Sequence, residues 1–343
     1  VFALSGGEKQ MLAFASVYAM NPEIYMLDEP TANLDEDAIR KLREQIILLK
    51  KQGKTVVIAE HRLFFLADII DRAVYIRNGE IKRIFSGEEF QALSDEERIS
   101  MGLRTIHQTE LRLKPAGNIE STSSEKTVGS EEASGSNGAD SGLCVRVLSC
   151  GYKKSPAVFE NLSFTAYPGE VLGITGHNGV GKSTLIRCLC GLLKEKGGSI
   201  TLNGRILKPK QRQKACYLVM QEVNHQLFSD TVFGECEQLG TADPEEIRRV
   251  LKHFDLDAYE DVHPMALSGG QKQRLAVATA VLSGREVLIF DEPTSGLDYR
   301  HMMEVCRITK QLATDGRIVL VVSHDKEFMQ EACDRLLTLG GGK

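Results

Sequence analysis

Residues that could hold a phosphate group are concentrated in one glycine-rich stretch that ends in a lysine and two hydroxyl residues. Residues 176–183 fit the pattern G-x-x-x-x-G-K-[ST], after an apolar strand-like run and before an apolar helical pattern. Glycines let the backbone wrap closely around phosphates, and the start of the helix attracts the anion. We expect Lys182 to reach the β- and γ-phosphates of a nucleotide and Ser183 to coordinate Mg²⁺. The candidate phosphate-binding residues are Gly176, Asn178, Gly179, Gly181, Lys182, Ser183 and Thr184.

Two adjacent carboxylates follow a short apolar run further along the chain. Residues 287–290 read Val-Leu-Ile-Phe and precede Asp291 and Glu292. A continuous apolar run is typical of a parallel strand that helices cover on both faces. We expect Asp291 to hold Mg²⁺ and Glu292 to polarise the attacking water as a general base. A single Asp-Glu pair could also do no more than end a strand.

An internal repeat with a constant offset of 263 residues favours the catalytic interpretation. Leu-Ser-Gly-Gly begins at residues 4 and 267, and Asp-Glu-Pro-Thr begins at residues 28 and 291. Leu-Asp at residue 34 and a histidine at residue 61 return at residues 297 and 324. Because four motifs keep one register, we predict two copies of one domain.

A segment with few large apolar residues separates the two copies. Residues 115–142 are rich in Ser, Gly, Glu and Ala and cannot offset their ordering entropy by burial. We predict a flexible linker there, between the C-terminal part of a first domain at 1–114 and a nearly complete second domain at 143–343. The lysine that matches Lys182 would lie about 80 residues before Val1, so we expect the first domain to be truncated at its N-terminus.

Composition and charge limit the possible partners. The 343 residues suffice for two globular domains, and the net charge of −5 gives no general reason to expect a nucleic-acid partner. No apolar run approaches the roughly 20 residues that span a bilayer, so a membrane role needs another polypeptide. All eight cysteines lie after residue 143 without a C-x-x-C pair, which favours reduced thiols over a zinc site. A solvated hairpin or strand edge is expected for the basic cluster Lys208, Lys210, Arg212 and Lys214.

These motifs resemble ABC-type ATPase domains over essentially the whole chain except the linker. The resemblance implies that the protein binds ATP and Mg²⁺ and hydrolyses ATP. Residues 267–271 match the family signature, whose serine and glycine amides contact the γ-phosphate held by the opposite domain. The signature residues are Ser5, Gly6 and Gly7 in the first copy and Ser268, Gly269 and Gly270 in the second.

The same resemblance implies roles for further side chains. His324, and His61 in the first copy, match the switch histidine that senses the γ-phosphate. Gln221 matches the glutamine that links Mg²⁺ and water to a membrane partner, and Glu29 is the counterpart of Glu292. Tyr152 matches the aromatic residue that stacks on adenine, although a simple packing role is an alternative.

In this family, ATP lies between two domains that associate head to tail. One such site would combine the phosphate loop around Lys182 with the signature around Ser5, and Asp298 matches the aspartate that communicates between the two sites. The other site would pair Ser268 with a phosphate loop that this sequence does not contain. The alternative is that this chain does not hydrolyse ATP, because it lacks that second phosphate loop.

The expected fold is of the α/β class, a P-loop NTPase of the ABC ATPase type. It combines a mainly parallel sheet flanked by helices with an antiparallel β region and a helical subdomain, in two copies of which the first is incomplete. Residues 230–266 are polar and helical in pattern, where the family places its helical subdomain. Strands are expected at 143–149, 162–166, 171–175, 199–202, 214–219, 286–290 and 317–322, and helices at 182–193, 269–282, 298–313 and 326–333.

Two kinds of double-headed ABC protein remain open. Residues 60–63 and 221–232 resemble energy-coupling-factor transporters for vitamins or metal ions, although many of those carry a proline where Val223 stands. That class implies a peripheral protein on the cytoplasmic face of the cell membrane, with a transmembrane subunit and a separate substrate-binding membrane component as partners. The alternative is a soluble ATPase that acts on ribosomes or nucleic acid. Such proteins usually join their heads by a charged helix, whereas this chain has a Ser/Gly-rich segment, so the transporter is favoured.

Overall fold

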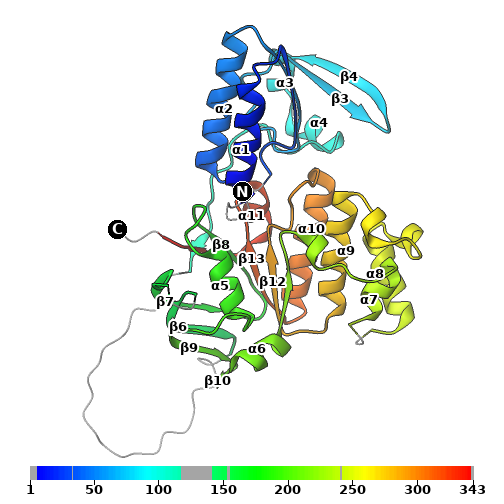
Figure 1. Ribbon diagram of the computed structural model, residues 1–343. Helices are drawn as coiled ribbons and strands as arrows, with labels where there is room; N and C mark the ends of the chain where they lie inside the picture. The colour runs from blue at the N-terminus through cyan, green and yellow to red at the C-terminus, as the bar shows by residue number, and fades with distance from the viewer. Residues whose placement is uncertain (1–5, 33, 117–140, 153–154, 240–241, 341–343) are drawn as a thin grey trace, which may run out of the picture. The chain divides into compact units, whose positions relative to one another are not determined.

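The computed structural model describes residues 6–32, 34–116, 141–152, 155–239 and 242–340 (Figure 1). Ser5 and most of the predicted linker therefore lie outside the described residues. The chain divides into two compact units. The first unit comprises Val1–Leu111, Thr294–Cys306 and His324–Glu331, and the second comprises Arg112–Pro293, Arg307–Ser323 and Ala332–Lys343.

The first unit begins with alternating helices and strands and continues with an antiparallel hairpin. Its elements are α1 (Gly6–Ala19), β1 (Ile24–Asp28), α2 (Glu36–Lys51), β2 (Thr55–Ala59), β3 (Arg72–Arg77), β4 (Glu80–Ser86), α3 (Gly87–Gln91) and α4 (Asp95–Ser100). β1 and β2 pair in parallel, while β3 and β4 pair antiparallel. Asp35 caps α2 by accepting a hydrogen bond from the backbone N–H of Ala38, and the buried face of α2 packs on Phe65 and Leu66.

A parallel sheet forms the centre of the second unit. Among the described residues its strand order is β11-β12-β13-β8-β14-β5, and every neighbouring pair is parallel. The strands are β5 (Lys114–Pro115), β8 (Val171–Thr175), β11 (Cys216–Val219), β12 (Val287–Asp291), β13 (Ile318–Val322) and β14 (Arg335–Thr338). All five residues of β13 are buried, as the apolar sequence predicts for a strand covered on both faces.

An antiparallel sheet and a group of helices complete the α/β fold. The antiparallel order is β10-β9-β6-β7, with β6 (Leu143–Cys150), β7 (Phe159–Ala166), β9 (Gly197–Leu202) and β10 (Arg205–Ile206). The helices are α5 (Lys182–Leu189), α6 (Pro209–Ala215), α7 (Val232–Glu237), α8 (Pro244–His253), α9 (Gly269–Leu282), α10 (Tyr299–Thr314) and α11 (Lys326–Ala332). α7 and α8 pack beside α9 (Figure 1), and both lie in the segment at 230–266 that was expected to be helical. No helix of the described residues is both long and apolar enough to cross a membrane.

Two expectations about local structure are wrong. α5 ends at Leu189 and not at residue 193, because Gly191 has φ +72° and a Cβ there would lie 2.1 Å from the carbonyl oxygen of Pro209. The basic cluster at 208–214 forms α6, with Pro209 in its first turn, where a hairpin or strand edge was expected. Arg212 is fully buried and pairs with Glu195, so that residue is not solvated.

The bounds of several elements repeat with the offset of the sequence motifs. α1 and α9 each contain 14 residues and begin at Gly6 and Gly269, which are 263 residues apart. The pairing of Ile24 with Thr55 between β1 and β2 returns as the pairing of Val287 with Ile318 between β12 and β13, again 263 residues later. The repeat therefore extends from the motifs to the elements between them.

Candidate functional site

The glycine-rich loop connects β8 to α5 in a conformation that few other residues could adopt. Gly176, Gly179 and Gly181 have φ angles of +151°, +82° and +110°. A Cβ on Gly181 would lie 2.7 Å from a methyl carbon of Val158, so a side chain does not fit there. Gly181 is the N-cap of α5 and no side chain caps the helix start, which leaves the first amides to bind an anion.

Lys182 folds back over this loop. Its Nζ donates hydrogen bonds to the carbonyl oxygens of Gly176 at 2.7 Å and His177 at 3.1 Å. The ammonium group is thus held at the mouth of the loop, where a bound phosphate would need a positive charge. Ser183 is exposed beside it, while Thr184 is buried.

The two predicted catalytic carboxylates stand at the end of β12, and the second has a strained backbone. Glu292 has φ +50°, a left-handed conformation that is costly for a residue with a side chain. Its backbone N–H is held by the carbonyl oxygen of Val322 at 2.8 Å, and Ser323 Oγ donates to Glu292 Oε2 at 2.7 Å. Glu29 repeats the conformation with φ +42°, and its N–H is held by the carbonyl of Ala59 at 2.9 Å.

Charge and burial make this strand end suited to a divalent cation. Burial and the charge of Glu292 together raise the pKa of Asp291 to about 7, against the opposing charges of Lys182 and Arg187. Only 5% of Glu292 is exposed. Two desolvated carboxyl groups that repel each other favour a hard cation with oxygen ligands, so this donor set fits Mg²⁺.

The strand order brings the other predicted elements of this site to the same edge of the sheet. Gln221 follows β11, Asp291 ends β12 and the glycine-rich loop follows β8. β11 pairs with β12, and both β12 and β8 pair with β13. Because all these strands are parallel, the segments after them lie at one carboxyl edge, where open α/β sheets bind ligands. His324 comes two residues after the end of β13.

The structure leaves the roles of Tyr152 and the signature residues as predictions. Tyr152 is 43% exposed, and its hydroxyl accepts a hydrogen bond from Arg187 at 2.9 Å. Ser268 caps α9 by accepting from the backbone N–H of Gln271 at 3.3 Å, and Gly269 is exposed at the helix start. Gly6, the first described residue, opens α1.

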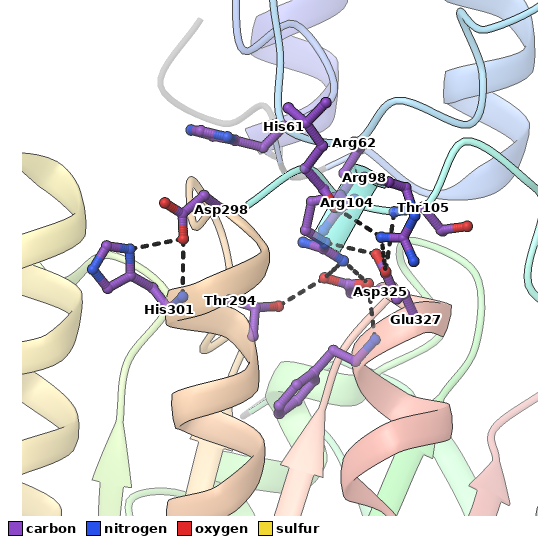
Figure 2. Close-up of polar contacts among 12 residues, drawn as sticks. His61, Arg62, Arg98, Arg104, Thr105, Thr294, Asp298, His301, Asp325 and Glu327 are labelled. Atoms are coloured by element: carbon purple, nitrogen blue, oxygen red, sulfur yellow. Dashed lines mark hydrogen bonds and ion pairs between the residues drawn. The ribbon is translucent and has the colours of Figure 1, made fainter. Parts of the chain in front are cut away.

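Residues from three segments of the first unit meet around Glu29. His61 Nε2 lies 3.9 Å from Glu29 Oε1, and a Cβ on Gly296 would lie 3.0 Å from Glu29 Oε2. Burial raises the pKa of Glu29, while His61 opposes this change. Asp298 caps α10 and accepts a hydrogen bond from the backbone N–H of His301, whose ring Nδ1 lies 2.8 Å from the same oxygen. Figure 2 shows His61 and Asp298 in this region.

Sequence reasoning missed several polar residues near the predicted switch histidine. Ser323 directly precedes His324, but its repeat counterpart is Glu60, so the repeat gives no sign of it. Asp325 binds Arg104 through a buried ion pair that joins positions 221 residues apart, which no local pattern could reveal (Figure 2).

Comparisons with known proteins agree with this geometry. The family model described as "ABC transporter" matches residues 1–32 and 159–295. A protein of Treponema denticola, named as an ABC transporter ATP-binding protein, is 45% identical over 345 residues, covering all of this chain and 68% of that protein. The chain belongs to the ABC transporter ATP-binding protein family. As a member it is an ATP-binding component of a family that hydrolyses ATP, typically with Mg²⁺, and works with membrane components.

Two further similarities place this ABC ATP-binding protein among its relatives. YkoD of Bacillus subtilis, named as an HMP/thiamine import ATP-binding protein, is 32% identical over 367 residues, covering 99% of this chain and 64% of YkoD. The solved structure of CbiO1 from Clostridium perfringens is described as part of the ABC transporter complex CbiONQ. It matches with a TM-score of 0.53 and 28% identity, covering 59% of this chain and 85% of CbiO1.

Proposed function

We propose that this ABC ATP-binding protein hydrolyses ATP at the carboxyl edge of its parallel sheet and thereby drives import through a separate membrane partner. The observation that carries the proposal is the convergence of Lys182, Asp291 and Glu292 at that edge, because the pKa of Asp291 responds to both other charges. The loop before α5 binds the phosphates, and Lys182 exchanges its loop carbonyls for phosphate oxygens.

Each remaining side chain of this site has a defined task in the proposed reaction. Ser183, Gln221 and Asp291 hold Mg²⁺, which neutralises negative charge on the phosphates. Glu292 accepts the proton of the attacking water while Ser323 fixes the carboxylate. His324 contacts the γ-phosphate, and Tyr152 stacks on adenine.

The proposal includes two copies of the ATPase domain in one chain, at 1–114 and 143–343, joined by a linker. The family comparisons do not separate two copies, so this part rests on the repeat of motifs, helix bounds and strand registers at one offset. Ile24 and Met26 on β1 are 60% and 78% exposed, whereas their counterparts Val287 and Ile289 on β12 are fully buried. This contrast supports a first copy that is represented here by its C-terminal part.

Head-to-tail association of the copies is part of the same proposal. In support of it, residues 294–306 and 324–331 of the second copy cluster with the first copy in one compact unit. Gly296 approaches Glu29 there; burial opposes ionisation of Asp298, but the hydrogen bonds from His301 and the charge of His61 lower its pKa. In the proposed association, the signature around Ser5 contacts the phosphates bound near Lys182.

The transporter class that we propose is the energy-coupling-factor type, on the cytoplasmic face of the membrane. The names of YkoD and CbiO1 favour import of a vitamin or metal ion over an action on ribosomes or nucleic acid. A tagged chain expressed in its native host should sediment with membranes and co-purify with a transmembrane subunit. Recovery with ribosomal particles in low salt, and not with membranes, would select the alternative.

The hydrolysis step is tested by Glu292→Gln and Lys182→Ala. We expect Glu292→Gln to lower the ATPase kcat by about 10²–10⁴-fold, the usual worth of a general base, while a fluorescent ATP analogue still binds. Lys182→Ala should weaken binding of the same analogue. If Glu292→Gln keeps the parent rate in a folded protein, Glu292 is not the base and the proposed mechanism is wrong.

The composite site is tested by introducing an arginine on α1 or just before it. Ser5→Arg places bulk and charge at the signature, and we expect it to abolish ATP hydrolysis. Ser16→Arg makes the same change at an exposed position of α1 and should leave the rate unchanged. Equal rates in both variants would contradict the head-to-tail site, and no hydrolysis by the parent would support the inert alternative.

A further inference from the structure

A buried ion-pair cluster joins two distant segments of the first unit. Arg104 Nη2 donates to both carboxylate oxygens of Asp325 at 2.5 and 2.7 Å, and Arg104 Nε donates to Glu327 Oε2 at 2.7 Å. The side chains of Arg104 and Asp325 are each 3% exposed. Figure 2 shows this fork between the segment that carries Thr105 and the start of α11. Donation from two nitrogens of one planar guanidinium to two different carboxylates fixes both distance and orientation.

The carboxylate of Asp325 also accepts hydrogen bonds from the Asp-Glu-Pro-Thr motif and from the first turn of α11. Thr294 Oγ1, from the Asp-Glu-Pro-Thr motif, donates to Asp325 Oδ2 at 2.9 Å. The backbone N–H of Phe328 in the first turn of α11 donates to Oδ1 at 3.2 Å. Asp325 directly follows His324 in the chain, so a fixed Asp325 limits where the histidine backbone can lie. Burial opposes ionisation, but Arg104 and Arg62 hold the pKa of Asp325 at about 2.

The cluster has no equivalent in the first copy, because the repeat partner of Asp325 is a residue of opposite charge. Arg62 stands 263 positions before Asp325, directly after His61. Glu327 Oε1 also accepts a hydrogen bond from the backbone N–H of Thr105 at 3.0 Å, and Arg98 Nη1 lies 3.6 Å from the same oxygen. The segment from Arg98 to Thr105 therefore contacts the switch loop of the second copy and the start of α11 through Asp325 and Glu327.

We propose that Arg104 is a positioning residue for ATP hydrolysis, which acts through Asp325 to hold His324 in its working place. The proposal rests on the proposed function of His324. Arg104 makes no contact with nucleotide in this role. Loss of its guanidinium therefore slows the chemical step and leaves nucleotide binding at the Lys182 loop unchanged.

The first experiment compares the ATPase kinetics of Arg104→Ala, Arg104→Lys and the parent chain. We expect Arg104→Ala to lower kcat at least tenfold, with KM and the Kd of a fluorescent ATP analogue within about twofold of the parent. Arg104→Lys keeps the charge but not the fork, so it should recover only part of kcat. Arg104 and Asp325 line a pocket of about 30 Å³ that the Arg104→Ala change enlarges, and added guanidinium ion should restore part of the Arg104→Ala rate through it.

Two further variants separate positioning from loss of folding. Arg104→Gln combined with Asp325→Asn replaces the ion pair with two neutral amides, while Glu327 keeps Arg98 as a cation. It should fold and still show the reduced kcat. Arg40→Ala removes an arginine whose ion pair with Asp37 is exposed on α2, and its kcat should equal that of the parent.

The outcomes distinguish this proposal from the one on which it rests. If Glu292→Gln abolishes turnover but folded Arg104→Ala keeps the parent kcat, the positioning role is wrong and the proposed function stands. A fall in kcat that matches only the loss of folded protein, without guanidinium rescue, also overturns it. If the parent chain does not hydrolyse ATP, both proposals fail together.

Discussion

The hydroxyl group of Ser323 donates a 2.7 Å hydrogen bond to Oε2 of Glu292, and both side chains are buried. A carboxylate can rotate about its terminal bond, and a proposed general base must present one oxygen to water. The hydrogen bond from Ser323 removes this freedom without neutralising the charge. Because Ser323 directly precedes His324 in the chain, this hydrogen bond ties the carboxylate of Glu292 to the segment that carries His324.

We expect Ser323→Ala to lower the ATPase kcat about tenfold, which corresponds to about 1.4 kcal/mol, close to the lower end of the range for a hydrogen bond to a charged group. Steady-state kinetics with saturating ATP measure this effect. Ser283→Ala is a matched control, because Ser283 is equally buried and donates only to the carbonyl of its own helix. A parent-like kcat for Ser323→Ala would show that Glu292 does not need this partner.

The raised pKa of Asp291 predicts a stability that depends on pH. Between the ordinary value of 3.8 and the folded value of about 7, the folded state binds more protons than the unfolded state. Stability of the metal-free protein therefore falls as pH rises through this range. Asp291→Asn has no carboxyl group to ionise and therefore keeps its stability over this pH range. Its Tm should exceed that of the parent by more at pH 8 than at pH 5.

Magnesium and a second variant provide the controls for this effect. Mg²⁺ in excess should stabilise the parent at pH 8 and shrink the difference from Asp291→Asn, because the cation offsets the buried charge. The exposed Asp257→Asn should give the same Tm difference at both pH values. If the Tm difference between Asp291→Asn and the parent is the same at pH 5 and pH 8, the raised pKa of Asp291 is contradicted.

Gly296→Ala tests the approach between Gly296 and Glu29. Its φ of +69° makes any side chain costly by about 1–2 kcal/mol, and the added Cβ would also press on the Glu29 carboxylate at 3.0 Å. Gly316→Ala is the matched control, because Gly316 has φ +85° but nothing within 4 Å of the added Cβ. Urea unfolding should show a similar loss for both variants, while only Gly296→Ala should also slow ATP hydrolysis. If both variants hydrolyse ATP at the same rate, the approach of Gly296 to Glu29 has no role in ATP hydrolysis.

Arg212 allows a test of the corrected interpretation of the basic cluster. It is fully buried against Glu195 and the carbonyl of Leu207, so Arg212→Ala removes a buried guanidinium and leaves the half-buried carboxylate of Glu195 without its cation. We expect a loss of about 3–5 kcal/mol in the free energy of unfolding. Lys210→Ala on the exposed face of α6 should change it by less than about 0.5 kcal/mol. If the two variants lose equal stability, the ion pair with Glu195 is not structural.

The sequence predicted the main strands and the loop around Lys182 because their causes are local. A continuous apolar run such as Ile318–Val322 implies burial on both faces, and glycine spacing before a lysine implies a phosphate-binding turn. Arg104 was invisible, because its role comes from a partner 221 residues away. Arg212 was misjudged for a related reason, since charge alone does not reveal which face of a helix becomes buried.

The two hydrogen bonds from Lys182 to the carbonyls of Gly176 and His177 tie its ammonium group to the loop that carries it. A phosphate that binds there must exchange with these carbonyl oxygens, so its affinity reflects that exchange and not the full strength of an ammonium–phosphate contact.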